Sequence, residues 1–153
     1  MENVQKNEIV DLILQLKEIV KQNDEFIIED KKYKEKRNII INKYNKYKFI
    51  INNKTDESYT YIGENNIYIS GKDWNRNSYD GLFIILHEIG HLETNTLKMS
   101  KAKREFEATK WAINESKKLN MYYISDTLKY TYELDIKDKL IQGESKDNYC
   151  FNW

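Results

Sequence analysis

The two histidines of this 153-residue chain lie four positions apart in the stretch LFIILHEIGHLE, residues 82–93. On a helix this spacing puts His87 and His91 one turn apart on the same face, so both imidazoles can reach a single metal ion. Glu88 follows about 100° further round the helix, near enough to take a proton from a metal-bound water without being a ligand. The motif predicts a helix that carries two zinc ligands and a general base.

The opposite side of this predicted helix is an apolar stripe formed by Leu82, Ile85, Ile89 and Leu92. We expect the stripe to pack on the core and the histidine face to remain free for an ion. Ser78 or Asp80 can cap the start of the helix, and its end is expected at about Leu92 or Thr94. The competing interpretation, in which both histidines only fill a core, requires their spacing to be accidental.

Two histidines do not complete the site, because catalytic zinc takes three protein ligands and keeps one open position. A carboxylate or, less favoured, Cys150 must supply the third ligand. The stretch REFEATKWA, residues 104–112, offers Glu105 and Glu107, which are about 200° apart on a helix, so only one of them can face the ion. Glu105 lies near the middle of the apolar arc, where a carboxylate needs a partner or a cation, and Glu107 lies at its edge. We therefore predict Glu105 as the ligand, Glu107 as the alternative, and Thr109 as a hydrogen-bond partner of a ligand.

Hydrophobic periodicity predicts further helices and a small sheet around the motif helix. The expected elements, in chain order, are a helix over 4–20, a helix within 30–48, a strand near 47–52, a β-hairpin over 58–70 that turns at GENN, a helix over about 100–119, and a helix from about 122 or 126 to 140 that ends near Gly143. The order of these elements predicts an α+β fold.

Composition limits the classes of protein to which the chain can belong. It has 25 basic and 25 acidic residues, so net charge gives no reason to expect nucleic acid or an anionic membrane as the main partner. Its single cysteine, Cys150, excludes an intrachain disulfide. No leader and no apolar run of membrane-spanning length is evident. We expect one cytoplasmic domain over residues 1–153.

The stretches LHEIGHLE and EFEATKWA together resemble the ImmA/IrrE family of small zinc-dependent metallopeptidases, whose pattern is HExxH followed by E-x-E-A-x-x-F/W-A. The hairpin YIGENNIYIS also resembles a strand of that family, so the likeness covers roughly residues 58–115. It implies a minimal zincin-like domain in which a small sheet with a hairpin packs on the HExxH helix. Many members have Asn or Asp where this chain has Thr109, and LLMP where it has INES.

Carried over residue by residue, the resemblance implies one Zn²⁺ bound by His87, His91 and a glutamate from the pair Glu105 and Glu107, with Glu88 as general base. Thermolysin-like enzymes place the glutamate ligand four residues before an acidic group that supports a ligand, which again favours Glu105. Better-known members of the family act on DNA-binding repressors of phages and mobile elements. The resemblance therefore implies a peptidase with a protein substrate of that kind.

Two other functions remain open from the sequence. The same fold could hold a metal without catalysis and act as an antirepressor or another regulatory binding protein. Alternatively, the basic and tyrosine residues of 31–48 could bind a nucleic-acid backbone with some stacking, although a helix with a solvated basic face suits the same pattern better.

Overall fold

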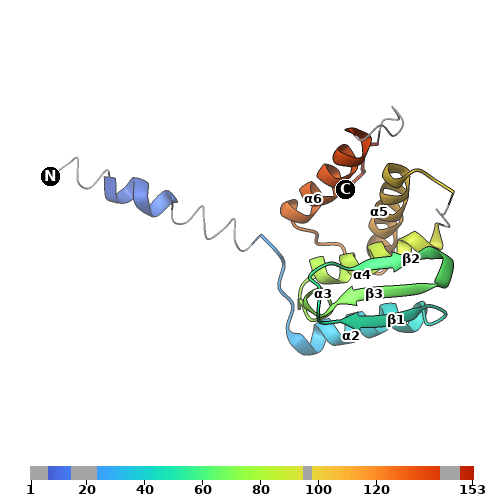
Figure 1. Ribbon diagram of the computed structural model, residues 1–153. Coiled ribbons are helices and arrows are strands. Elements are labelled where there is room, and N and C mark those ends of the chain that lie inside the picture. Colours follow the sequence, from blue (N-terminus) through green and yellow to red (C-terminus); the bar gives the residue numbers. More distant parts are fainter. Residues whose placement is uncertain (1–6, 15–23, 95–97, 142–148) are drawn as a thin grey trace.

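The structure is a computed structural model that describes residues 7–14, 24–94, 98–141 and 149–153. It has an α+β architecture in which a three-stranded sheet lies beside the helices (Figure 1). In chain order the elements are α2 (Asp30–Lys43), β1 (Lys48–Asn52), β2 (Tyr59–Tyr61), the 3-10 turn η1 (Ile62–Glu64), β3 (Asn66–Ser70), α3 (Gly71–Trp74), α4 (Tyr79–Glu93), α5 (Lys101–Lys118) and α6 (Asp126–Ile141). The predicted α+β fold class is confirmed.

The sheet has the order β1-β3-β2, with β3 in the centre. β2 and β3 form the predicted antiparallel hairpin, in which Tyr59 is paired with Tyr68. The turn between them contains Asn65 at a φ of 56°, a left-handed conformation that asparagine tolerates better than most residues. β1 runs parallel to β3, and β2 pairs on one side only, so it is an edge strand.

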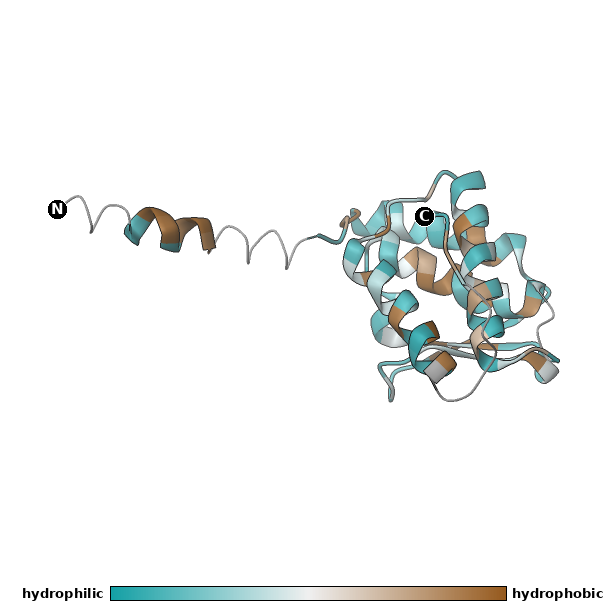
Figure 2. Ribbon diagram, turned by 90° about the horizontal axis from the view of Figure 1, so that it is seen from above, coloured by the Kyte–Doolittle hydropathy of each residue, from teal (hydrophilic) through white to brown (hydrophobic). Residues whose placement is uncertain are grey.

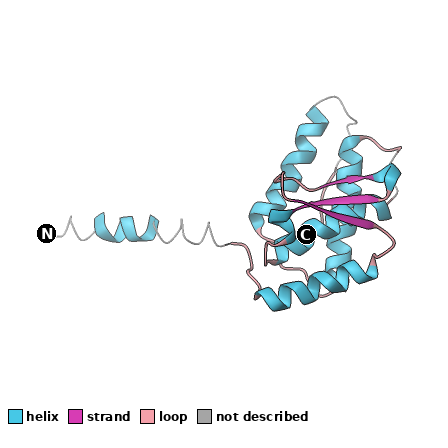
Figure 3. Cartoon of the chain, turned by 60° about the horizontal axis from the view of Figure 1, so that its bottom comes forward, coloured by secondary structure: helices cyan, strands magenta, loops and turns pink. Residues whose placement is uncertain are grey.

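The core lies between one face of this sheet and the helices. On β3 the side chains of Ile67 and Ile69 are fully buried, whereas those of Asn66 and Tyr68 are half-buried, the alternation expected of a sheet covered on one face. α4 packs against β2 and β3 on one side and against α5 on the other (Figures 1 and 3). The motif helix is therefore the central element of the fold.

Serine side chains that cap the N-termini of α3 and α4 explain where these helices begin. Ser78 precedes α4, and its hydroxyl accepts a hydrogen bond from the backbone N–H of Gly81, as predicted for a cap. Asp80, the alternative cap, is instead buried and accepts hydrogen bonds from the backbone N–H and the hydroxyl of Ser125. The segment between β3 and α4 contains the short helix α3, which Ser70 caps by accepting a hydrogen bond from the N–H of Asp73.

A buried carboxylate ties α2 to α5. Glu115 is 5% exposed and accepts hydrogen bonds from the ammonium of Lys43 and the hydroxyl of Tyr44. Burial raises the pKa of Glu115, but the hydrogen bonds from these two partners outweigh it, so the pKa is lowered from its ordinary value. The charged form of this glutamate is thus the form that stabilises the fold.

Residues 7–14 form a helix with many hydrophobic residues (Figure 2). Its apolar side chains are exposed, including Ile9 at 58% and Leu12 at 56%. The remainder of the helix predicted over 4–20 lies outside the described residues, as does Gly143 near the predicted end of α6. Among the residues that the structure describes, no helix is long and apolar enough to cross a membrane.

Candidate metal centre

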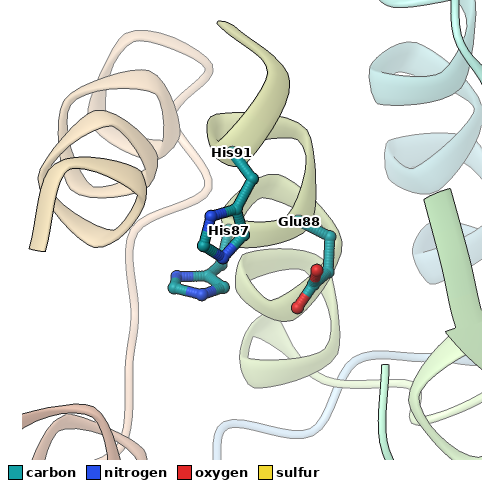
Figure 4. A group of neighbouring side chains, drawn as sticks. All are labelled: His87, Glu88 and His91. Atoms are coloured by element: carbon teal, nitrogen blue, oxygen red, sulfur yellow. The ribbon is translucent and has the colours of Figure 1, made fainter. Parts of the chain in front are cut away.

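His87 and His91 project from successive turns of α4, and Glu88 projects from the same turn as His87 in another direction (Figure 4). One ligand atom from each of the three lies within 4.8 Å of those of the other two, a spacing that a single ion can span. The two imidazole rings are 4.9 Å apart and nearly perpendicular, so their nitrogens converge from different directions. In Figure 4 the imidazoles lie towards α5, whereas the carboxylate of Glu88 lies on the side of the sheet.

α5 brings Glu105 to the histidines. Its Oε2 lies 3.0 Å from Nε2 of His87, and its Oε1 lies 3.4 Å from Nε2 of His91. Burial raises the pKa of Glu105, but its hydrogen bonds with both imidazoles outweigh this and hold the pKa well below its usual range. Burial lowers the pKa of His87, but the hydrogen bond with Glu105 outweighs this and raises it. Each group therefore favours the charged form of the other.

The close approach of α5 to α4 depends on small residues. Ala108 and Ala112 are fully buried. A Cβ added to Gly90 would lie 2.7 Å from the backbone oxygen of Ala108, so a larger residue at Gly90 would not fit without moving α5. The glycine inside the HEIGH motif thus lets α5 lie near enough for a glutamate side chain to reach both imidazoles.

Thr109 contacts the other side of the first histidine. Its hydroxyl lies 3.1 Å from Nδ1 of His87, and the threonine is fully buried. When Thr109 accepts the proton of Nδ1, Nε2 carries the lone pair that a metal ion requires. The contact therefore orients the imidazole, and the threonine hydroxyl is placed to accept the proton of Nδ1 when Nε2 binds an ion.

Thr60 of β2 positions Glu88, a contact that the sequence did not predict. Its hydroxyl lies 2.6 Å from Oε2 of Glu88 and 3.0 Å from the backbone oxygen of the same residue. Only one of these acceptors can take the hydroxyl proton at a time. The strand pattern of YTY gives no indication of this contact, because it depends on how β2 sits against α4.

The histidine face of α4, which we expect to be free for an ion, is buried beneath other helices. His87 is 3% exposed, Glu88 7% and His91 8%, because α5 and α6 pack over them. Tyr132 of α6 stacks on the imidazole of His87 with ring centres 4.6 Å apart. Access to the site is instead through a cavity of about 700 Å³, which His87, Glu88, Glu105 and Tyr132 line.

The residues present fit a metal ion of the zinc type. Ligands bound tetrahedrally at about 2.0–2.1 Å stand roughly 3.3 Å from one another. Oε2 of Glu105 lies near that separation from Nε2 of His87, at 3.0 Å, and its other oxygen, Oε1, lies 3.4 Å from Nε2 of His91. Two imidazoles and one carboxylate are also a common ligand set of catalytic zinc.

The other candidate residues are placed elsewhere. Glu107 is half-buried, and within the described ranges no contact joins it to either histidine. Cys150 lies at a different cavity, lined by residues of α6 and the C-terminal segment. In the basic stretch 31–48, Tyr33 is fully buried and Tyr44 is 7% exposed. These two rings are therefore not available to stack on nucleic-acid bases.

Comparison with protein-family models, with curated proteins and with solved structures finds no match to this chain.

Proposed function

We propose that this protein is a zinc-dependent metallopeptidase that hydrolyses a protein substrate. The observation that carries the proposal is the carboxylate of Glu105, which a second helix brings within 3.0 and 3.4 Å of the two imidazole nitrogens of the HExxH motif. A motif alone supplies two ligands and a base, whereas this contact would add the third ligand at the wall of a cavity large enough for a peptide segment.

In this proposal His87, His91 and Glu105 hold the ion, with Thr109 fixing the first imidazole. The bound ion would lower the pKa of a water molecule and polarise the carbonyl of the substrate. Glu88 takes the proton of the attacking water and delivers it to the departing amine. Thr60 restrains the carboxylate of Glu88 during both transfers, since its hydroxyl contacts Oε2.

The resemblance to the ImmA/IrrE family extends the proposal to the substrate. It favours a DNA-binding repressor of a phage or mobile element. The support for this extension is the pair of stretches LHEIGHLE and EFEATKWA, which contain the ligands and the base assigned above.

Metal content tests the ligand assignment. Purified protein should contain one zinc ion per chain, and Glu105→Ala should lose most of it. Glu107→Ala is the matched control on the same helix and should keep its zinc, because its side chain does not contact the histidines. Retention of zinc by Glu105→Ala, or equal loss from both variants, would contradict the assignment.

Glu88→Gln tests catalysis separately from binding. The amide is close in size to the carboxylate but cannot accept the proton, so the variant should bind zinc as the wild type does and cleave protein substrate at least a hundredfold more slowly, the usual contribution of general base catalysis being about 10²–10⁴-fold. Full biological activity in this variant would instead identify the protein as a metal-binding antirepressor that does not need catalysis.

A further inference from the structure

Two cavities meet at the candidate metal centre. The larger, of about 700 Å³, reaches His87, and the smaller, of about 270 Å³, reaches His91. Glu88 and Glu105 line both. A peptide whose scissile carbonyl lies at the ion would therefore extend into one cavity on one side of the bond and into the other cavity on the other side.

The two cavities differ in charge. The larger cavity is lined by six carboxylates and one guanidinium that the smaller cavity lacks. The guanidinium is that of Arg76, and the carboxylates are those of Asp24, Glu25, Glu57, Asp73, Asp80 and Asp135. Two cations and no carboxylate line the smaller cavity and not the larger; they belong to Lys101 and Arg104. In a chain with equal numbers of acidic and basic residues, this separation across one site is a local feature that net charge does not reveal.

Part of the negative charge in the larger cavity is already compensated. Arg76 pairs with Glu25 and Asp73, and both oxygens of Asp80 accept hydrogen bonds from Ser125. Asp24 and Glu57 are the exposed carboxylates of the wall and come from separate segments, one before α2 and one before β2. Asp24 accepts hydrogen bonds from the backbone N–H and the hydroxyl of Thr127. Within the described part of the chain neither carboxylate belongs to an ion pair, so a cationic side chain can approach both without breaking one.

The smaller cavity has a guanidinium with one unsatisfied nitrogen among the described residues. The Nε of Arg104 is buried and has no hydrogen-bond partner within the described residues. Lys101 lies three positions earlier on α5, on the same side of the helix, and is exposed. A guanidinium beside an ammonium in a small cavity suits a carboxylate, which can accept hydrogen bonds from both.

We propose that the two cavities together form a substrate cleft with a negative side and a positive side. This cleft selects a peptide that carries a carboxylate on one side of the scissile bond and a basic side chain on the other. Lys101 and Arg104 bind the carboxylate, and Asp24 and Glu57 bind the basic group. This specificity rests on the proposed peptidase function, but its test does not, because it measures binding and not cleavage.

Isothermal titration calorimetry with three capped hexapeptides tests the proposal. The first has the order Glu-Glu-Ala-Ala-Lys-Lys, the second has the reverse order, and the third has glutamine at all four charged positions. The zinc-loaded Glu88→Gln protein is used so that no peptide is cleaved. One of the two charged orders should bind about tenfold or more tightly than both the other order and the neutral peptide. Equal binding of all three peptides would overturn the proposal.

Variants then assign each side of the cleft. Arg104→Gln should weaken binding of the preferred peptide about tenfold and leave a peptide that keeps only its lysines unchanged, whereas Lys103→Gln, an exposed neighbour that lines neither cavity, should change nothing. Glu57→Gln should weaken the lysine-only peptide, with Asp56→Asn as its control. If Arg104→Gln and Lys103→Gln have the same effect, the carboxylate subsite is wrong. If the wild type cleaves no peptide, the peptidase proposal fails while these binding results still decide the charge preference.

Discussion

Gly90 is the residue of α4 on which the position of α5 depends, and Gly90→Ala tests whether that position completes the metal centre. The added Cβ would lie 2.7 Å from the backbone oxygen and 3.2 Å from the Cα of Ala108. Both are backbone atoms, so neither can rotate away. Restoring an ordinary contact of 3.4 Å to the oxygen requires α5 to withdraw by about 0.7 Å.

Two opposing effects set the change in stability. Alanine is about 1 kcal/mol better than glycine inside a helix, whereas overpacking a close helix contact costs roughly 1–3 kcal/mol. We therefore expect Gly90→Ala to lower the free energy of unfolding of the metal-free protein by up to about 2 kcal/mol. Zinc affinity should fall as well, because withdrawal of α5 carries Glu105 away from both imidazoles. We expect a loss of roughly 10–100-fold, the range seen when groups around a metal site are disturbed.

Urea denaturation in the presence of a chelator measures the first effect, and competition with a chromophoric chelator measures zinc affinity. Gly63→Ala is the matched control, since a Cβ at Gly63 meets nothing within 4 Å, and it should keep wild-type affinity. A Gly90→Ala protein that is as stable as the wild type and binds zinc equally well would refute the view that helix approach at this glycine positions Glu105.

Three further predictions follow from the buried polar groups. Thr109→Val should keep the packing volume but remove the contact with Nδ1 of His87, and should lower zinc affinity about tenfold in the same competition assay. Replacement of His87, His91 and Glu105 together by leucine should be neutral or stabilising by about 1–4 kcal/mol in urea denaturation without metal; marked destabilisation would show that the three groups stabilise the fold by themselves. The lowered pKa of Glu115 means that its stabilising contribution is present above about pH 4.5 and is lost as the pH falls through its folded-state pKa. The stability deficit of Glu115→Gln, about 1–2 kcal/mol at pH 7, should therefore shrink below pH 4.5, and a deficit that grows there would contradict the sign.

Local pattern was sufficient for the elements that carry the site. The apolar stripe and the serine before it place α4 within a residue or two of its observed bounds, because periodicity and capping are properties of neighbouring residues. The position of Glu105 on the helical wheel likewise predicted which carboxylate of α5 faces inward, since a helix fixes the angle between its side chains. Its contact with both histidines agrees with that prediction, while its role as a ligand remains a proposal.

Contacts between segments that are distant in the sequence could not be predicted from local pattern. Thr60 and Glu88 are 28 positions apart, and their hydrogen bond depends on the register of an edge strand against a helix, for which no local pattern exists. The cover over His87 comes from Tyr132 on α6, whose residues look like those of an ordinary surface helix. For the same reason the separation of charge between the two cavities appears only when the residues of five or more segments are brought together.

The burial of His87, His91, Glu88 and Glu105 bears on whether these residues form a metal site or only fill the core. Taking two imidazoles and two carboxylates out of water costs free energy that mutual hydrogen bonds recover only in part, and apolar side chains of the same volume would stabilise the helix interface better. The chain nevertheless keeps Gly90 and Ala108 small, which brings the polar groups closer together and gives up apolar contact area. A packing arrangement that favours convergence of ligands over burial of apolar surface is expected where a bound cation supplies the missing stabilisation, and it is not expected where histidines only fill a core.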